Sequence, residues 1–205
     1  MRLTNMEKSF VNSWLRTLML RKLEAPKVLS NLVIGKKSVC LDIGCGRGVS
    51  LLLINQYLNC DKVIGIDLDP DMIEYAIEFL SRPPRWAKNI RTDNIELLNE
   101  NATNLNFPDQ NFNAVFLFGV LHHILDWKKV ISEIYRILKL GGILSFVEEI
   151  LMPKYFSNIH SSKESNYFKY NIIYKENLIK FLKQLGFSII GIKRLLTSCF
   201  IRVKK

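Results

Sequence analysis

The sequence predicts a doubly wound α/β sheet, mostly parallel, whose last two strands form an antiparallel pair at one edge. Short apolar runs alternate with helical segments over most of the chain, and two strand-like runs in succession close it. A third observation is a strand that breaks into three glycines at every second position and leads into a helix. With 205 residues, 48% of them hydrophobic, the chain is long enough for one domain over 1–205.

The N-terminal segment, residues 1–37, is expected to form a helical cap on this domain. Apolar residues recur at helical spacing over 6–24, and Pro26 fits the start of a second short helix that continues to Ile34. The first helix either packs on the core, covers an active site or lies on a membrane surface. Peripheral membrane contact is therefore one of the interpretations that the sequence leaves open.

Residues 38–43 are typical of a buried parallel strand, and the helix expected at 49–58 follows a loop with Gly44, Gly46 and Gly48. Glycines let the backbone approach a ligand without Cβ clashes, and a helix start offers unpaired N–H groups. A strand, a glycine turn and a helix in this order indicate a site for a nucleotide-like ligand.

The second strand, 62–67, ends in Asp67, which lies 23 residues after Gly44. This spacing is typical of an acidic residue that binds a ribose diol, because a carboxylate accepts two hydroxyl hydrogen bonds at once. The alternative is that Asp67 caps the next helix. Asp69 and Pro70 fit that helix start better, which favours the ligand role for Asp67.

The remaining elements continue the alternation. In order, they are a helix at 71–80, a strand at 94–99, a polar loop at 101–109, a strand at 112–118, a helix at 126–140 closed by Gly141 and Gly142, a strand at 143–147, a helix at 176–185 and strands at 187–194 and 198–204. Glu148 and Glu149 follow the fifth strand at the edge where ligands bind, and either orient an acceptor or cap local structure. Residues 150–173 lack periodicity and are expected to form a lid-like insertion.

Charge is unevenly distributed along the chain, whose net charge is +10. Residues 1–40 carry 8 Lys/Arg and 2 Asp/Glu, residues 41–149 carry 10 and 15, and residues 150–205 carry 11 and 2. Uniform basicity would favour nucleic acid. This split favours an acidic cofactor-binding core with basic flanks, and leaves nucleic acid as the less favoured partner. We expect Lys8, Arg16, Arg21 and Lys22 to belong to a lid that selects an anionic or amphipathic small molecule.

Other classes of protein are disfavoured. No apolar run approaches the roughly 20 residues that span a bilayer, and no signal-type segment follows the first residues, so a cytoplasmic location is expected. The cysteines, Cys40, Cys45, Cys60 and Cys199, show no CxxC spacing and no companion histidine cluster. Neither a disulfide nor a metal site is therefore predicted.

Five blocks, in the expected order, resemble class I S-adenosylmethionine-dependent methyltransferases, and within them the group that includes the ubiquinone and menaquinone methyltransferases. The blocks are Leu41–Gly48, Gly65–Met72, Asn101–Asp109, Leu121–Ile124 and Arg136–Gly142. The resemblance covers roughly residues 38 to 195. It implies a Rossmann-like seven-stranded sheet, S-adenosylmethionine as the methyl donor and a small molecule as the acceptor.

The resemblance also implies roles for single residues. Asp42 would anchor the amino group of the methionine portion, directly or through water, and the backbone around that portion would come from Gly44, Cys45, Gly46, Phe118 and Gly119. Asp67 would hold the ribose hydroxyls, with Leu68 against the adenine. The amide of Ala102 would face adenine N1, and Asn101 would contact the exocyclic amine. The family usually has Asp at 101 and at 113, where this chain has Asn; Asn101 keeps a carbonyl acceptor but lacks the charge.

His122 and His123 are the candidate bases beside the cofactor. A sulfonium is already an activated methyl donor, so a base is needed only if the acceptor holds its proton at neutral pH. Adjacent residues point different ways, so at most one of the two is expected to face the cleft. The alternative is that both histidines have packing roles.

Three rival functions remain at this stage. A nicotinamide-dependent dehydrogenase shares the glycine turn and the acid, but Gly48 comes too early for its G-x-G-x-x-G pattern. A protein that binds or methylates RNA is suggested by the positive net charge, and a methyltransferase that acts on protein is kept beside it as an alternative. A catalytically silent relative would bind the cofactor only as a structural or regulatory module.

Overall fold

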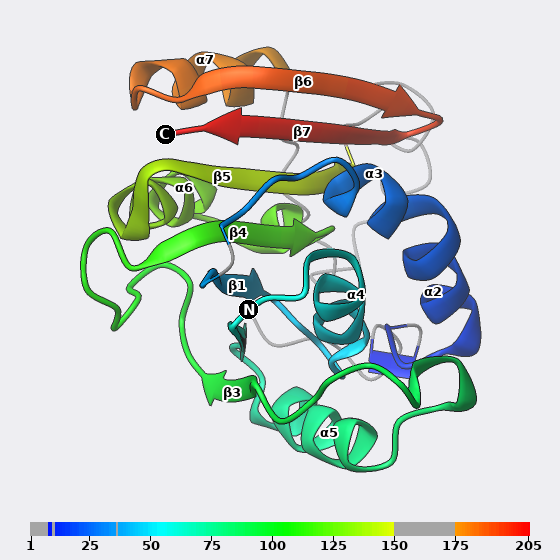
Figure 1. Ribbon diagram of the computed structural model, residues 1–205. Helices are drawn as coiled ribbons and strands as arrows, with labels where there is room; N and C mark the ends of the chain where they lie inside the picture. The colour runs from blue at the N-terminus through cyan, green and yellow to red at the C-terminus, as the bar shows by residue number, and fades with distance from the viewer. Residues whose placement is uncertain (1–7, 10, 36, 150–174) are drawn as a thin grey trace.

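The computed structural model describes residues 8–9, 11–35, 37–149 and 175–205, and this part of the chain contains one seven-stranded sheet. The strand order is β3-β2-β1-β4-β5-β7-β6 (Figure 1). The strands are β1 (Val39–Ile43), β2 (Lys62–Asp67), β3 (Ile95–Asn99), β4 (Phe112–Phe118), β5 (Leu138–Glu149), β6 (Ser188–Leu195) and β7 (Ser198–Lys204). The first five are parallel, and β7 is antiparallel to both β5 and β6. The predicted fold class is confirmed.

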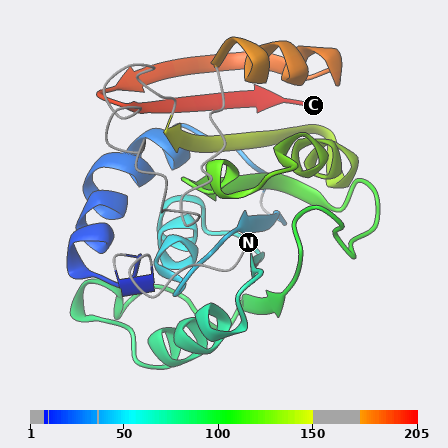
Figure 2. The same cartoon turned by 180° about the vertical axis from the view of Figure 1, so that it is seen from behind.

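Helices pack on both faces of the sheet (Figures 1 and 2). They are α2 (Trp14–Met19), α3 (Ala25–Leu29), α4 (Val49–Leu58), α5 (Pro70–Ser81), α6 (Trp127–Ile137) and α7 (Lys175–Gln184), with a π-helix η1 (Leu20–Glu24) and 3₁₀ turns η2 (Arg85–Ala87) and η3 (Leu121–His123). Side chains of α3, α4 and α5 form one hydrophobic core with the sheet, and those of α6 and α7 form the other. The apolar runs of β1 and β4 are buried because both faces are covered.

The centre of the sheet determines where a ligand can bind. β1 pairs with β2 on one side and with β4 on the other, so the strand order reverses between β1 and β4. Loops that leave the carboxyl ends of these two strands diverge to opposite faces and open a crevice at this point. The glycine loop after β1 and the segment after β4 border that crevice.

The N-terminal cap differs from the prediction of one helix over 6–24. Ser13 has an extended backbone, with ψ of 156°, and its side chain accepts a hydrogen bond from the N–H of Arg16 at 3.1 Å. Ser13 therefore begins a new helix at Trp14, because a serine that caps a helix start stabilises it more than it stabilises a helix interior. The second helix, predicted to reach Ile34, ends at Leu29.

The helix predicted over 126–140 ends at Ile137, so the proposed Gly141–Gly142 stop is wrong. Leu138 is already extended and pairs with Phe112 of β4. The Nζ of Lys205 donates to the carbonyls of Tyr135 at 2.6 Å and Leu138 at 2.8 Å, and so satisfies the helix end that a glycine cap would otherwise serve. Gly141, at φ of 77°, lies inside β5 instead.

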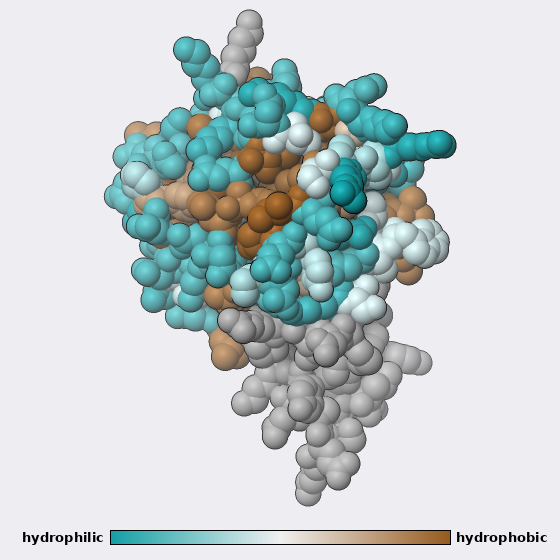
Figure 3. All heavy atoms as spheres, turned by 90° about the horizontal axis from the view of Figure 1, so that it is seen from below, coloured by the Kyte–Doolittle hydropathy of each residue, from teal (hydrophilic) through white to brown (hydrophobic). Residues whose placement is uncertain are grey.

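Seen from the β3 end of the sheet, the surface is mainly hydrophilic with a hydrophobic band across it (Figure 3). The exposed apolar side chains of α5, Tyr75 and Ile77, belong to this end of the molecule. None of the helices in the described part of the chain has the length and apolar character needed to cross a membrane. The lid-like insertion predicted at 150–173 lies outside the described residues.

Candidate active site

A cavity of about 810 Å³ lies at the carboxyl ends of β1, β2 and β4, where the strand order reverses. Its walls come from the glycine loop, the ends of β2 and β4, the loop after β3, η3 and the N-terminal helices. Of the predicted site residues, all except Asp42 line it: Gly44, Cys45, Gly46, Asp67, Leu68, Asn101, Ala102, Phe118, Gly119, His122 and His123. The structure thus brings residues from four separate sequence blocks to one place.

The glycine loop is a tight turn that only glycine can form at its first position. Gly44 has φ of 71°, and a Cβ added to it would lie 2.6 Å from Cγ2 of Val120. The N–H groups of Gly44 and Cys45 both donate to the carbonyl of Ile66, at 2.8 and 3.0 Å. The two hydrogen bonds to Ile66 therefore hold the turn against β2, and the side chain of Val120 packs over Gly44.

Asp67 at the end of β2 is a largely buried carboxylate that lines the cavity. Its two oxygens accept hydrogen bonds from the N–H groups of Gly46 and Asp69, each at 3.0 Å. Burial raises its pKa, and these backbone donors offset part of the rise. Asp69 caps α5 through the N–H of Asp71, as predicted. Each oxygen of Asp67 has a further lone pair for a hydroxyl donor.

Asp42 occupies a different place from the other predicted residues. It is completely buried and does not line the cavity. Its carboxylate accepts the hydroxyl hydrogen of Ser50, a residue of α4 that does line the cavity. Burial raises the pKa of Asp42 to about 7. Ser50 therefore stands between Asp42 and the cavity, a relation that the sequence pattern did not indicate.

The loop after β3 carries Asn101 and Ala102 along the cavity wall. The side-chain oxygen of Asn101 accepts hydrogen bonds from the backbone N–H and the hydroxyl of Thr103, at 3.0 and 2.9 Å, which forms a local turn. Arg136 of α6 fixes the far end of the loop by donating to the carbonyls of Leu105 at 2.9 Å and Phe107 at 2.7 Å. Sequence reasoning missed this role of Arg136, since only the folded loop brings the two segments together.

Both histidines line the cavity, so the expectation that at most one would face it is wrong. Their rings lie 4.0 Å apart between centroids, tilted by 43°. Nδ1 of His122 is hydrogen bonded to Oε1 of Glu148, while Oε2 of Glu148 accepts the N–H of Leu121 at 2.8 Å. Glu148 is completely buried, so it orients the His122 ring from behind, which agrees with the structural alternative considered for it.

The four cations expected in one lid have four different environments. Lys8 forms ion pairs with Asp69 at 2.7 Å and Asp71 at 2.5 Å, and Arg21 stacks over Trp86 at 4.1 Å. Of the four, only Arg16 lines the cavity, whereas Lys22 is exposed. Lys8 and Arg21 therefore hold the described part of the cap against the core. Arg16 is the one cation of these four that lines the cavity.

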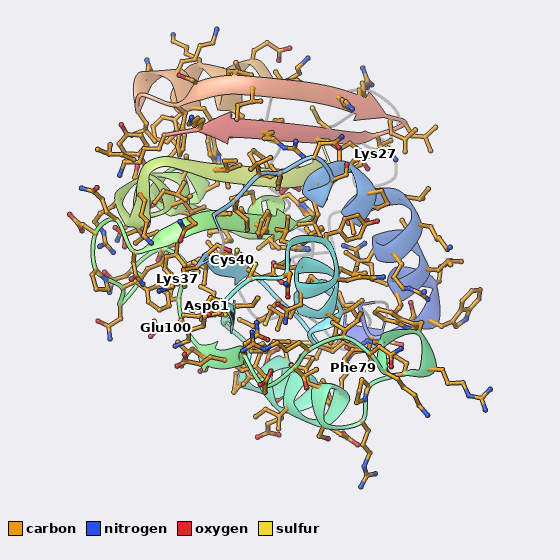
Figure 4. The ribbon with its side chains drawn as sticks, viewed as in Figure 1. Lys27, Lys37, Cys40, Asp61, Phe79 and Glu100 are labelled. Carbon is orange, nitrogen blue, oxygen red and sulfur yellow. The ribbon has the colours of Figure 1, made fainter. Side chains whose placement is uncertain are left out.

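A second arginine, Arg47, connects the glycine loop to the cap. Its Nη2 donates to the hydroxyl of Thr17 at 2.5 Å, and its guanidinium lies 5.1 Å from the ring centroid of Phe79, labelled on α5 in Figure 4. Among the described residues, no group of three or more His, Cys, Asp or Glu side chains could hold a metal ion.

Comparison with known proteins identifies a family that this chain matches. Residues 41–146 match a family described as a methyltransferase domain. A demethylmenaquinone methyltransferase of Symbiobacterium thermophilum is 36% identical over 103 residues, which are 50% of this chain and 39% of that protein. YcgJ of Bacillus subtilis, an uncharacterized methyltransferase, is 31% identical over 108 residues, 53% of this chain and 39% of that protein. The chain thus spans less than half the length of these relatives.

Solved structures agree on the fold. An S-adenosylmethionine-dependent methyltransferase from Aquifex aeolicus superposes with a TM-score of 0.73 over 99% of both chains, at 17% sequence identity. At that identity the likeness concerns the fold alone, and it includes the seven-stranded sheet with its antiparallel edge pair.

Proposed function

Since this chain belongs to the methyltransferase domain family, we propose that it transfers a methyl group from S-adenosylmethionine to a small-molecule acceptor. The observation that supports this most directly is the cavity itself. Its lining includes the largely buried acid Asp67 and a histidine, His122, that is backed by the buried Glu148. Its volume, about 810 Å³, lies in the range of small-molecule sites.

The residues present fit the cofactor. Asp67 would accept the ribose hydroxyls, Leu68 would pack against the adenine, and Asn101 and Ala102 would contact the adenine edge. The glycine loop at 44–46 and the backbone of Phe118 and Gly119 would surround the methionine portion. Asp42 would act on the amino group from behind Ser50. When bound, the cofactor supplies a sulfonium-activated methyl group, which needs no covalent help from the protein.

His122 would serve as the general base and Glu148 as its positioning residue. The bond from Nδ1 to Glu148 fixes the ring, so proton exchange with an acceptor falls to Nε2. The acceptor would lose its proton to Nε2 and then use the freed electron pair to form the new bond to the methyl carbon. The cofactor would supply the methyl group, with its sulfonium sulfur as the leaving group that takes the electron pair. His123, whose ring lies against that of His122, would help to hold the base in place.

The acceptor would be an amphipathic molecule with an acidic hydroxyl or carbon. The demethylmenaquinone methyltransferase relative supports this class by its name. Apolar residues among those that line the cavity support it too: Val11, Met19, Leu20 and Ile124. A base such as His122 is useful only for an acceptor that holds its proton at neutral pH. An aliphatic thioether has no such proton and would need no base.

Two measurements test the proposal. In calorimetry, S-adenosylhomocysteine should bind and NAD should not, whereas saturable NAD binding alone would support a dehydrogenase. With labelled S-adenosylmethionine, methyl transfer should be detected to reduced demethylmenaquinone and not to bulk RNA or protein. Transfer to RNA with a steep salt dependence would contradict the small-molecule acceptor. Binding without transfer to any of these acceptor classes would favour a silent relative.

A further inference from the structure

We propose that Arg16 is a cofactor-binding residue that pairs with the carboxylate of the methionine portion. The cap helix α2 would then complete the site instead of merely covering it. This inference rests on the proposed binding of S-adenosylmethionine. It assigns a role to a residue outside the blocks that carry the family resemblance, and it explains why one basic side chain of the cap is turned inward.

The position of the guanidinium is the first argument. Nη2 of Arg16 donates to the carbonyl of Phe118 at 3.0 Å, across 102 residues of sequence. A Cβ added to Gly119 would lie 3.9 Å from the same nitrogen. Arg16 therefore lies over the end of β4, where the amino group of the methionine portion is expected. The amino and carboxylate groups share one carbon, so a cation beside the first is within reach of the second.

The second argument is that the glycine loop has few donors left for a carboxylate. The N–H groups of Gly44 and Cys45 are bonded to Ile66, and that of Gly46 to Asp67. The N–H of Gly48 donates to the carbonyl of Cys45 at 2.9 Å. A carboxylate buried here without a cation would carry a large desolvation cost. The acids Glu24, Asp67 and Glu100 also line the cavity and would repel it.

The third argument concerns how Arg16 is held. Glu24 pairs with Nη1, and both side chains are largely shielded from solvent. A guanidinium has five N–H donors, and the bonds to Glu24 and Phe118 account for two of them. Arg16 can thus stay fixed by the protein and still bind a carboxylate. Arg47, the other arginine of the cavity wall, is directed at Thr17 and Ser13 of the cap.

The test compares two ligands that differ by one carboxylate. S-adenosylmethionine and its decarboxylated form are titrated calorimetrically into the wild type, Arg16→Met and Arg21→Met. Arg21 is the matched control because it has the same charge, lies in the same cap and does not line the cavity. Arg16→Met should weaken S-adenosylmethionine roughly 10- to 100-fold and the decarboxylated form less than about twofold. Arg21→Met should affect neither.

Other outcomes would overturn the proposal. An unchanged affinity of Arg16→Met for S-adenosylmethionine would mean that Arg16 does not contact the cofactor and serves the acceptor or the cap. An equal loss for both ligands would mean that Arg16 supports the cap structure. The Arg16→Lys variant keeps the charge, and thermal melts of both Arg16 variants would show whether either is misfolded. A carboxylate-selective loss in Arg47→Met alone would assign the role to Arg47. If the wild type binds neither ligand, it is the proposed function that fails.

Discussion

Glu148 contacts the imidazole Nδ1 of His122 with one carboxylate oxygen and the N–H of Leu121 with the other. Glu148 and His122 are 26 positions apart in sequence: Glu148 lies near the end of β5, and His122 lies in η3, which follows the adjacent strand β4. Because Glu148 is completely buried, solvent does not screen its contact with His122. The pair therefore behaves as one unit in which the acid fixes the direction of the base.

Replacing Glu148 by Gln should slow methyl transfer roughly 10- to 100-fold, because the His122 ring loses its fixed orientation and its anionic partner. His122→Asn should slow transfer by a similar or larger factor. The double variant should be no slower than His122→Asn, since the two residues act together. The measurement is single-turnover transfer to the proposed acceptor, reduced demethylmenaquinone. Calorimetry with S-adenosylhomocysteine should give affinities within about twofold of the wild type. If the losses of the two single variants add in the double variant, Glu148 and His122 act independently.

Asp42 should make stability depend on pH. Its pKa is raised from 3.8 to about 7 in the folded state, so the folded protein retains the proton more readily than the unfolded chain. The stabilisation is fully present below about pH 4 and is lost as pH rises through 7. Relative to Asp42→Asn, the wild type should therefore lose on the order of 2 kcal/mol between pH 5 and pH 8. Urea denaturation at both pH values measures this, and a difference independent of pH would contradict it.

Gly44→Ala should destabilise the protein more than Gly46→Ala does. Both positions have positive φ, which costs an alanine roughly 1–2 kcal/mol. At 44 the added Cβ would also lie 2.6 Å from Val120, whereas at 46 the contact is with Val11 at 3.3 Å. Adding Val120→Ala should recover part of the extra cost at 44 and none at 46. Urea midpoints of the five variants, two single glycine changes, Val120→Ala and the two doubles, would show this.

Asn101→Asp should tighten S-adenosylhomocysteine binding roughly three- to tenfold, because a charged acceptor forms a stronger bond to the adenine amine. The bonds from Thr103 need only an oxygen at this position, so the turn should persist. S-inosylhomocysteine, which lacks the amine, is the matched ligand and should show no gain. A tighter affinity for both ligands, or a weaker one, would mean that residue 101 does not contact the exocyclic amine.

Much of the fold follows from local patterns. Alternating apolar runs and helices define the parallel strands, and parallel strands bring their carboxyl ends to one edge, so Asp67 and the glycine loop were placed from sequence. The end of α6 was not, because Lys205, 68 residues beyond Ile137, decides it by capping the helix. Local patterns also do not predict the hydrogen bond from Arg16 to Phe118 or the contact of Glu148 with His122, because both join residues far apart in the sequence. Ser13 shows the opposite case, in which a local cap overrides helical periodicity.

The bonds between the cap and the glycine loop have a kinetic consequence. Arg47 holds Thr17, and Lys8 holds Asp69 and Asp71 beside the start of α5. Any movement of the cap away from the loop would have to break these contacts together. A bound ligand beneath the cap therefore leaves no faster than that separation allows, and its residence time should shorten as salt weakens the exposed pair of Lys8 with Asp71. Turnover would then be paced by product departure, and ionic strength would control its rate.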